Sequence, residues 1–410
     1  MTPSSSSGES GQPALHRVSL PALALGLVLG VAGVLCLRTG AGVPVGWRAR
    51  NSTSAILSSR PGPWGDLKLT PIITEPPEAF IAGPRVEELR WHFQGYTPAR
   101  LRMLLRELAL PAAQREALEN APWEDTGRGI IVRPDPELVL RLDVRARQQL
   151  YAVLGAFPEN PRQFQPFRFR AAMVKNWLSG AGLRPETESL VRRLLYPRGT
   201  AMAFADYDVV APLVGDPAER TRLLKALSRR PTVLARLRVP PHSDTEELAA
   251  YWSAGDRASD IFPLLASLGR QAEGSDIGVV HLLPPLPRQL LYTYPRPTPD
   301  GDEVRRDSHW TSLNFLRSQW DDQLAGNEPA VREALARSCD EVPAATRLGD
   351  IIVFESADGS LLHSCSYVAD QLVFTKNGPG QEVPWILMTS EDVLSFYAAV
   401  ADVRVRVYRA

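Results

Sequence analysis

The residues best suited to chemistry lie near the C-terminus of the 410-residue chain. Two apolar runs bracket Asp358-Gly359, a residue pair typical of a hairpin turn. His363 lies in the second run, and Asn377 follows the next one. A histidine held on a strand can take a proton from a nucleophile, and an amide on the next strand can fix its tautomer. This pattern indicates the base and the orienting residue of a hydrolase that works by acyl transfer.

These side chains must be held by strands and by the helices on either side of them. Four apolar segments predict strands at residues 351–356, 361–368, 372–376 and 385–388. Asp307 predicts the cap of a helix before the strands, and Thr389 with Asp392 predicts a capping box after them. The strict alternation of residues 403–407 predicts a final, half-exposed strand.

The order of these elements resembles the NlpC/P60-like branch of the papain-like hydrolases. In that family a Cys nucleophile begins a helix, a Gly-Asp pair opens the first core strand, and a His begins the second. Gly349-Asp350 and His363 match this pattern, and the resemblance covers residues 300–410. It implies an α+β domain with a small antiparallel sheet, and hydrolysis of amide or peptide bonds in cell-wall peptides.

The resemblance also implies a third polar residue that orients the imidazole of His363. Asn377 is the first choice for this role because it follows the neighbouring strand. Asp370 is the second choice, and its place between two strands also suits an ordinary turn residue.

The chain departs from the family pattern at the nucleophile. The family's cysteine would fall within residues 306–311, where this chain has Ser308. Cys365 shares a strand face with His363, but adjacent positions on one face rarely give nucleophile–base geometry. His309 directly follows Ser308 and is predicted to cap the helix at the surface or to line a groove. An alcohol is far less acidic than a thiol, so a serine needs proton removal during attack and a well-formed oxyanion hole.

Three interpretations therefore remain open. The favoured one is a catalytically impaired NlpC/P60-like domain that serves as a binding or scaffolding module. The second is an active hydrolase with Ser308 as nucleophile, His363 as base and Asn377 as orienter. In the third, His363 is a satisfied core histidine and the resemblance is accidental. The placement of Ser308 relative to the ring nitrogens of His363 distinguishes them.

The N-terminal residues predict a membrane anchor. Residues 1–18 are polar, and residues 19–37 carry no charge over about the length that spans a bilayer. An uncleaved anchor is favoured over a cleaved signal peptide because the cleavage site is poor. Flanking arginines favour a cytoplasmic body, whereas bacterial anchors of this form usually export the domains that come after them. The favoured location is the extracytoplasmic face of the bacterial inner membrane, with peptidoglycan peptides or an envelope protein as partners.

The remaining segments complete an α+β chain. Residues 38–83 are rich in Gly, Ser, Pro and Arg and predict a linker. Residues 84–285 show helical spacing and predict a mostly helical domain, with short strands at 130–132 and 138–142. Residues 286–299 are rich in Pro and predict a second linker.

Composition excludes some classes of function. The formal net charge is zero and no long basic run occurs, which argues against nucleic acid as a partner. Three cysteines do not make a disulfide framework. The sequence contains no phosphate-binding loop, no dinucleotide fingerprint and no metal-ligand spacing, so it predicts no cofactor and no metal.

Overall fold

The computed structural model describes the greater part of the chain after residue 56. The described residues are 57–78, 81, 87–108, 110–170, 173–199, 201–254, 257–296, 306–397 and 402–410. The predicted polar N-terminus (1–18) and membrane helix (19–37) lie outside these residues. Most of the described residues belong to strands and helices of a mixed α+β structure.

The prediction of a membrane protein is corrected. No helix among the described residues is both long enough and apolar enough to cross a bilayer. This finding contradicts the predicted transmembrane architecture, the signal anchor and the location at the bacterial inner membrane. The prediction rested on residues 19–37 alone, and no described helix takes over that role.

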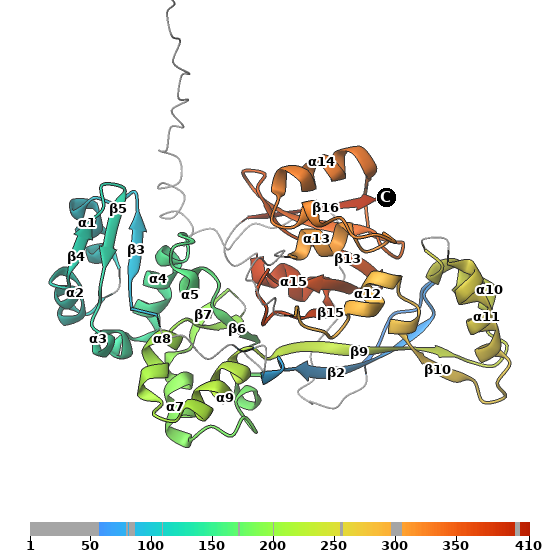
Figure 1. Ribbon diagram of the computed structural model, residues 1–410, viewed down its shortest axis with the longest axis horizontal. Coiled ribbons are helices and arrows are strands. Elements are labelled where there is room, and N and C mark those ends of the chain that lie inside the picture. Colours follow the sequence, from blue (N-terminus) through green and yellow to red (C-terminus); the bar gives the residue numbers. More distant parts are fainter. Residues whose placement is uncertain are drawn as a thin grey trace, which may run out of the picture. The chain divides into compact units, whose positions relative to one another are not determined.

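Two long strands, β2 (Asp66–Thr74) and β9 (Arg230–Val239), form a ribbon (Figure 1). All nine residues of β2 pair antiparallel with β9. β1 (Leu57–Ser58) and β10 (Ser275–Gly278) complete a four-stranded sheet in the order β1-β2-β9-β10. β1 and β2 therefore lie within the segment that was predicted to be a linker. Between β9 and β10 the chain forms α10 (Thr245–Trp252) and α11 (Ala258–Gly269).

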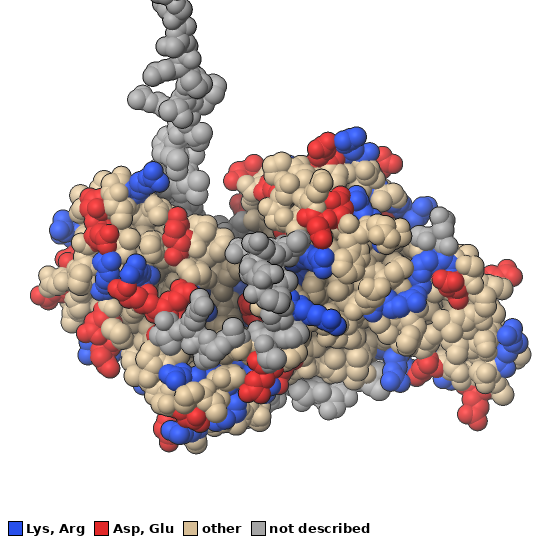
Figure 2. All heavy atoms as spheres, viewed as in Figure 1, with Lys and Arg blue, Asp and Glu red and all other residues tan. Residues whose placement is uncertain are grey.

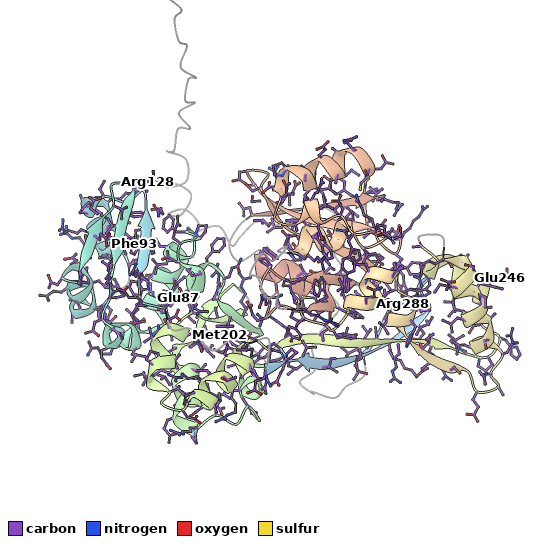
Figure 3. All side chains as sticks on the ribbon, in the orientation of Figure 1. Glu87, Phe93, Arg128, Met202, Glu246 and Arg288 are labelled. Carbon is purple, nitrogen blue, oxygen red and sulfur yellow. The ribbon has the colours of Figure 1, made fainter. Side chains whose placement is uncertain are left out.

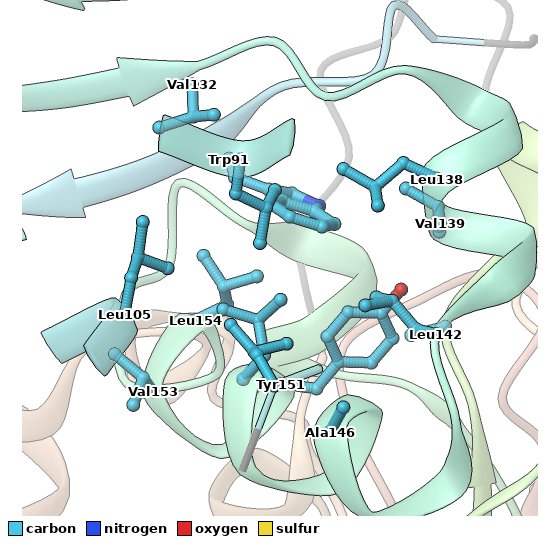
Figure 4. Close-up of a cluster of buried hydrophobic side chains, with 14 of the residues drawn as sticks. Trp91, Leu105, Val132, Leu138, Val139, Leu142, Ala146, Tyr151, Val153 and Leu154 are labelled. Carbon is cyan, nitrogen blue, oxygen red and sulfur yellow. The ribbon is translucent and has the colours of Figure 1, made fainter. Parts of the chain in front are cut away.

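A first small module surrounds a three-stranded sheet in the order β3-β5-β4. Its core is apolar and includes Trp91, Val139 and Leu154 (Figure 4). Residues 138–142 were predicted to be a strand, but most of them form a helix because Asp135 caps it and Pro136 begins it. The module contains β3 (Trp91–Gln94), α1 (Pro98–Glu107), α2 (Ala112–Glu119), β4 (Trp123–Asp125), β5 (Gly129–Val132), α3 (Pro136–Arg141), α4 (Val144–Leu154) and α5 (Pro161–Phe164).

A second small module also combines a three-stranded sheet with helices, in the order β6-β8-β7. With β9 and β10, these two sheets add more strands to the region 84–285 than the sequence predicted, although helices still contribute most of its regular structure. The strands are only three or four residues long and alternate with helices, so the helical spacing dominates the sequence pattern. The module contains β6 (Phe167–Arg170), α6 (Val174–Trp177), α7 (Pro185–Leu194), β7 (Tyr196–Arg198), β8 (Ala201–Phe204), α8 (Tyr207–Val210), η3 (Ala211–Leu213) and α9 (Pro217–Leu227).

The C-terminal residues form a six-stranded antiparallel sheet in the order β11-β16-β12-β13-β14-β15. The four predicted central strands and the final strand are confirmed. So is the capping box at Thr389, whose hydroxyl accepts from Asp392 N at 3.1 Å. The elements are α13 (Ser308–Leu313), η5 (Asp322–Leu324), α14 (Glu328–Ser338), β11 (Asp340–Val342), β12 (Ile351–Ser356), β13 (Leu361–Ala369), β14 (Leu372–Lys376), β15 (Trp385–Thr389), α15 (Ser390–Tyr397) and β16 (Val403–Arg409).

The C-terminal sheet is tied to the β2–β9 ribbon. Thr232 Oγ1 donates to Leu387 O at 2.7 Å and accepts from Leu387 N at 3.2 Å. The proline-rich segment predicted as a linker begins inside a short helix, α12 (Pro285–Leu290), which follows η4 (Val279–His281). Tyr292 N then donates to Trp385 O at 2.8 Å, which attaches this segment to β15.

Charged side chains cover the described surface without a large patch of one sign on the face that Figure 2 shows.

Arg147 and Asp206 form a buried ion pair, with side chains that are 1% and 2% exposed. Arg147 Nη1 donates to Asp206 Oδ2 at 2.6 Å, and the Tyr151 hydroxyl donates to Asp206 Oδ1. Arg147 Nη2 also donates to Val139 O at 2.9 Å and Leu142 O at 3.1 Å, so this network joins α3 and α4 to the start of α8.

We expect Asp206→Asn to lower the free energy of unfolding by about 3 kcal/mol, because it leaves the buried guanidinium of Arg147 without a counter-charge. Glu333→Gln is the matched control, since the Glu333–Arg337 pair has side chains that are 65% and 75% exposed and should contribute less than about 1 kcal/mol. Urea unfolding of both variants measures the difference. Equal losses would contradict a structural role for the buried pair.

Candidate functional site

The predicted nucleophile begins α13, as the family pattern implies. Asp307 caps the helix, because its Oδ1 accepts from Trp310 N at 2.9 Å. Ser308 is the first helical residue and is 6% exposed. The helix ends at Leu313.

The predicted base is fully enclosed. His363 on β13 is 1% exposed. Its Nε2 lies 2.8 Å from Thr375 Oγ1 on β14, and its Nδ1 lies 3.0 Å from the hydroxyl of Tyr397 on α15. The Tyr397 ring also stacks on the imidazole, with a centroid distance of 5.0 Å and an interplanar angle of 25°. Both ring nitrogens of His363 therefore have hydroxyl partners.

The charge state of His363 follows from this enclosure. Burial lowers the pKa of the imidazole well below its usual value, and the nearby His309 lowers it further. The ring is therefore neutral at physiological pH, with one nitrogen donating and the other accepting. Two hydroxyls satisfy such a ring, because each can donate or accept.

Ser308, on α13, and the side chain of His363 lie on opposite sides of the sheet. Ser364 faces α13, since its Oγ lies 2.6 Å from Ser312 Oγ and 2.9 Å from His309 Nδ1. Successive side chains of a strand point to opposite faces, so His363 points away from α13, together with Cys365. No hydrogen bond joins Ser308 to His363, although the structure describes both residues. The predicted nucleophile and base are not brought together.

The predicted orienter reaches His363 only through another residue. Asn377 Oδ1 accepts from Thr375 Oγ1 at 3.4 Å, and Asn377 Nδ2 donates to Met388 Sδ at 3.0 Å. Thr375 therefore contacts the imidazole where Asn377 was expected. Thr375 lies two residues before Asn377 and therefore faces the same side of the sheet. The alternation of side chains along a strand could thus have identified Thr375 as a partner of His363. The contact from Tyr397 depends on how α15 packs and leaves no local signal.

The two candidate aspartates have structural partners. Asp370 occupies the β13–β14 turn with φ 52° and accepts from Arg60 Nε at 2.7 Å. It lies seven residues beyond His363, just past the end of β13, which is about 23 Å at the rise of a strand, so it cannot orient the imidazole. Asp350 is 2% exposed and accepts from Arg409 Nε at 2.7 Å. Burial raises the pKa of Asp350, but bonds from Arg409 and from the backbone of Arg347 outweigh it and hold the pKa below its usual value.

The remaining supporting residues are also buried or bonded. Cys365 is 0% exposed, and burial raises the pKa of its thiol, which disfavours a thiolate. His309 was expected at the surface or in a groove, but it is partly buried and bonds Ser364. Burial lowers the pKa of His309. Ser364 itself is 2% exposed, so the His309–Ser364 pair offers no accessible nucleophile.

We expect the free energy of unfolding to fall as the pH drops below about 6.5, where a histidine in the unfolded chain takes up a proton and the buried His363 does not. His363→Gln has no imidazole at this position and so loses this pH dependence. Below about pH 6.5 the free energy of unfolding of the variant should therefore fall less steeply than that of wild type, with the two slopes differing by about 1.4 kcal/mol per pH unit. His309, whose pKa is also lowered, remains in both proteins. Urea unfolding between pH 7 and pH 5 measures both slopes.

Tyr397→Phe is the control for this comparison. It removes one hydroxyl partner but keeps the buried imidazole, so its stability should keep the wild-type dependence on pH. Parallel curves for wild type and His363→Gln would contradict a buried neutral imidazole.

Comparison with known proteins adds no match. No family model, no curated protein and no solved structure is similar to this chain. The NlpC/P60-like resemblance thus rests on the order of elements and on Gly349-Asp350 and His363 alone. The arrangement around His363 is that of a satisfied buried histidine rather than of an accessible base.

Proposed function

We propose that residues 300–410 form a non-catalytic binding module of NlpC/P60-like type. One observation carries this proposal: both ring nitrogens of His363 are bonded to hydroxyls, from Thr375 at 2.8 Å and Tyr397 at 3.0 Å. A general base needs a free ring nitrogen within hydrogen-bond reach of the proton that it removes. Neither nitrogen is free, and the ring is enclosed.

The chemistry of serine gives further support. A hydroxyl is not ionised near neutral pH, so Ser308 depends on a base during attack. The Nδ1 atom of His309, the next residue, is bonded to Ser364 Oγ at 2.9 Å. An active hydrolase would therefore require His363 to leave two hydrogen bonds and its stacked position against Tyr397.

A surface beside α13 offers groups suited to a peptide ligand. Trp320 is 40% exposed, and the guanidinium carbon of Arg306 lies 4.5 Å from its ring centroid. Arg306 Nε pairs with Asp322 Oδ1 at 3.1 Å, and Trp310 Nε1 donates to the same oxygen at 2.8 Å. We call Trp320, Arg306 and Asp322 the Trp320 surface. An indole for stacking beside a fixed cation and anion can hold the amides and carboxylates of cell-wall peptides.

We expect wild type, Ser308→Ala and Ser308→Cys all to lack turnover of soluble peptidoglycan peptides, because His363 cannot reach residue 308. The thiol of Ser308→Cys should react with iodoacetamide along a pH profile near the ordinary cysteine pKa of about 8.5. Its profile should stay the same when His363→Gln is added. Chromatography of the peptides and mass spectrometry of the alkylated protein measure these outcomes.

The competing hydrolase hypothesis predicts the opposite results. Turnover by wild type that Ser308→Ala abolishes would establish an active serine enzyme. Turnover gained only by Ser308→Cys, or an acidic thiol profile that depends on His363, would indicate a working base. Any of these results would reject the non-catalytic module.

We expect Trp320→Ala to weaken binding of a soluble peptidoglycan peptide about tenfold, the scale of one lost aromatic anchor at a binding surface. Val405→Ala is the matched control, because Val405 is 50% exposed on β16 and lies outside the Trp320 surface. Isothermal titration calorimetry with the full chain measures both affinities. An equal effect of the two substitutions, or no binding by wild type, would reject this surface as the ligand site.

A further inference from the structure

A buried arginine with a free donor lies between α10 and α11. Arg257 is 7% exposed, and its Nη1 donates to Leu282 O at 2.8 Å. Its Nη2 is buried and has no hydrogen-bond partner. A buried guanidinium is ordinarily paired with an acidic group, because an unpaired charge is costly to remove from water. Arg257 has no ion pair with a carboxylate among the described residues.

A second guanidinium adds to the positive charge. Arg288 on α12, labelled in Figure 3, donates from Nε to Leu283 O at 3.3 Å and from Nη2 to His281 O at 3.2 Å. Burial lowers the pKa of Arg257 first, and the charge of Arg288 lowers it further. Three consecutive carbonyls, those of residues 281–283, thus hold two like-charged groups near one another.

The helix that follows Arg257 makes the electrostatic imbalance larger. Arg257 is the N-cap residue of the 12-residue helix α11, and no side chain caps that terminus. A helix N-terminus carries partial positive charge and favours anions over cations. Among the described residues, the charge of Asp260 in the first turn raises the pKa of Arg257, but no ion pair joins the two side chains. Among the described residues, the positive charges of Arg257 and Arg288 and the N-terminus of α11 are therefore not matched by an ion-paired carboxylate.

We propose that Arg257, Arg288 and the N-terminus of α11 bind a small phosphate-type oxyanion. A doubly charged tetrahedral anion offers several acceptor oxygens and can take bonds from two guanidiniums and from free backbone N–H groups. The carbonyls of residues 281–283 hold both guanidiniums in position without neutralising them. A bound oxyanion would supply the counter-charge and the acceptor that the buried Nη2 of Arg257 lacks.

The test uses the full chain and inorganic phosphate, with chloride at equal ionic strength as the reference. Phosphate should raise the melting temperature of wild type above the chloride value, since a ligand of the folded state stabilises it. Arg288→Gln should bind phosphate at least about tenfold more weakly, because one charge-assisted contact is lost. Arg236→Gln removes an exposed arginine of β9 and should leave phosphate binding unchanged. Phosphorus NMR line broadening measures the same affinities independently.

Further arms identify the source of the oxyanion. Glycerol phosphate in place of inorganic phosphate tests whether a phosphate monoester is accepted, and acetate tests for a simple carboxylate. Arg257→Lys keeps the charge but not the planar fork and should also weaken binding, with circular dichroism as the check that it folds. The proposal is overturned if phosphate and chloride act alike on wild type. It is also overturned if Arg288→Gln and Arg236→Gln respond equally, or if acetate binds as well as phosphate.

Discussion

The C-terminal sheet depends on one buried carboxylate. Asp350 Oδ2 accepts from Thr346 N at 2.8 Å, Arg347 N at 2.9 Å and Arg409 Nη2 at 2.7 Å, while Oδ1 accepts from Arg409 Nε at 2.7 Å. These bonds hold the loop before β12 and the last residue of β16 at the same point. β12 pairs with both β16 and β13, and His363 lies on β13. The carboxylate therefore fixes β12, the strand whose pairing sets the register of His363. The Asp350 side chain is 1% exposed, so removing its partner Arg409, which is 26% exposed, would leave a buried carboxylate without its counter-charge.

The glycine before this aspartate is required for a different reason. Gly349 has φ +92°, and an added Cβ would lie 2.7 Å from Leu316 Cδ1. A side chain at this position would therefore be strained by the backbone and would also clash with a residue just after α13. The Gly-Asp pair that carries the family resemblance acts here through conformation and hydrogen bonding. Its presence supports a folded sheet and does not by itself support catalysis.

The sequence predicts the C-terminal strands well because alternation, turn residues and caps are local signals. Asp307 and Thr389 mark helix starts through side-chain bonds to backbone groups within three residues. The partners of His363 are not local: Tyr397, at the end of α15, lies 34 residues further along the chain. Of the short strands in the middle modules, the prediction at residues 130–132 is confirmed by β5, and the others escaped prediction because three or four residues carry too little periodicity to distinguish a strand from a helix.

The separation of Ser308 from His363 is a matter of parity and cannot be removed by a small adjustment. Turning His363 toward α13 requires a one-residue slip of β13, which would move every side chain of that strand to the other face. Cys365 and Tyr367, now 0% and 6% exposed in the apolar core, would leave it together. The same core that holds the sheet therefore keeps the imidazole from the helix N-terminus. Exchanging Ser308 for a better nucleophile does not change that geometry.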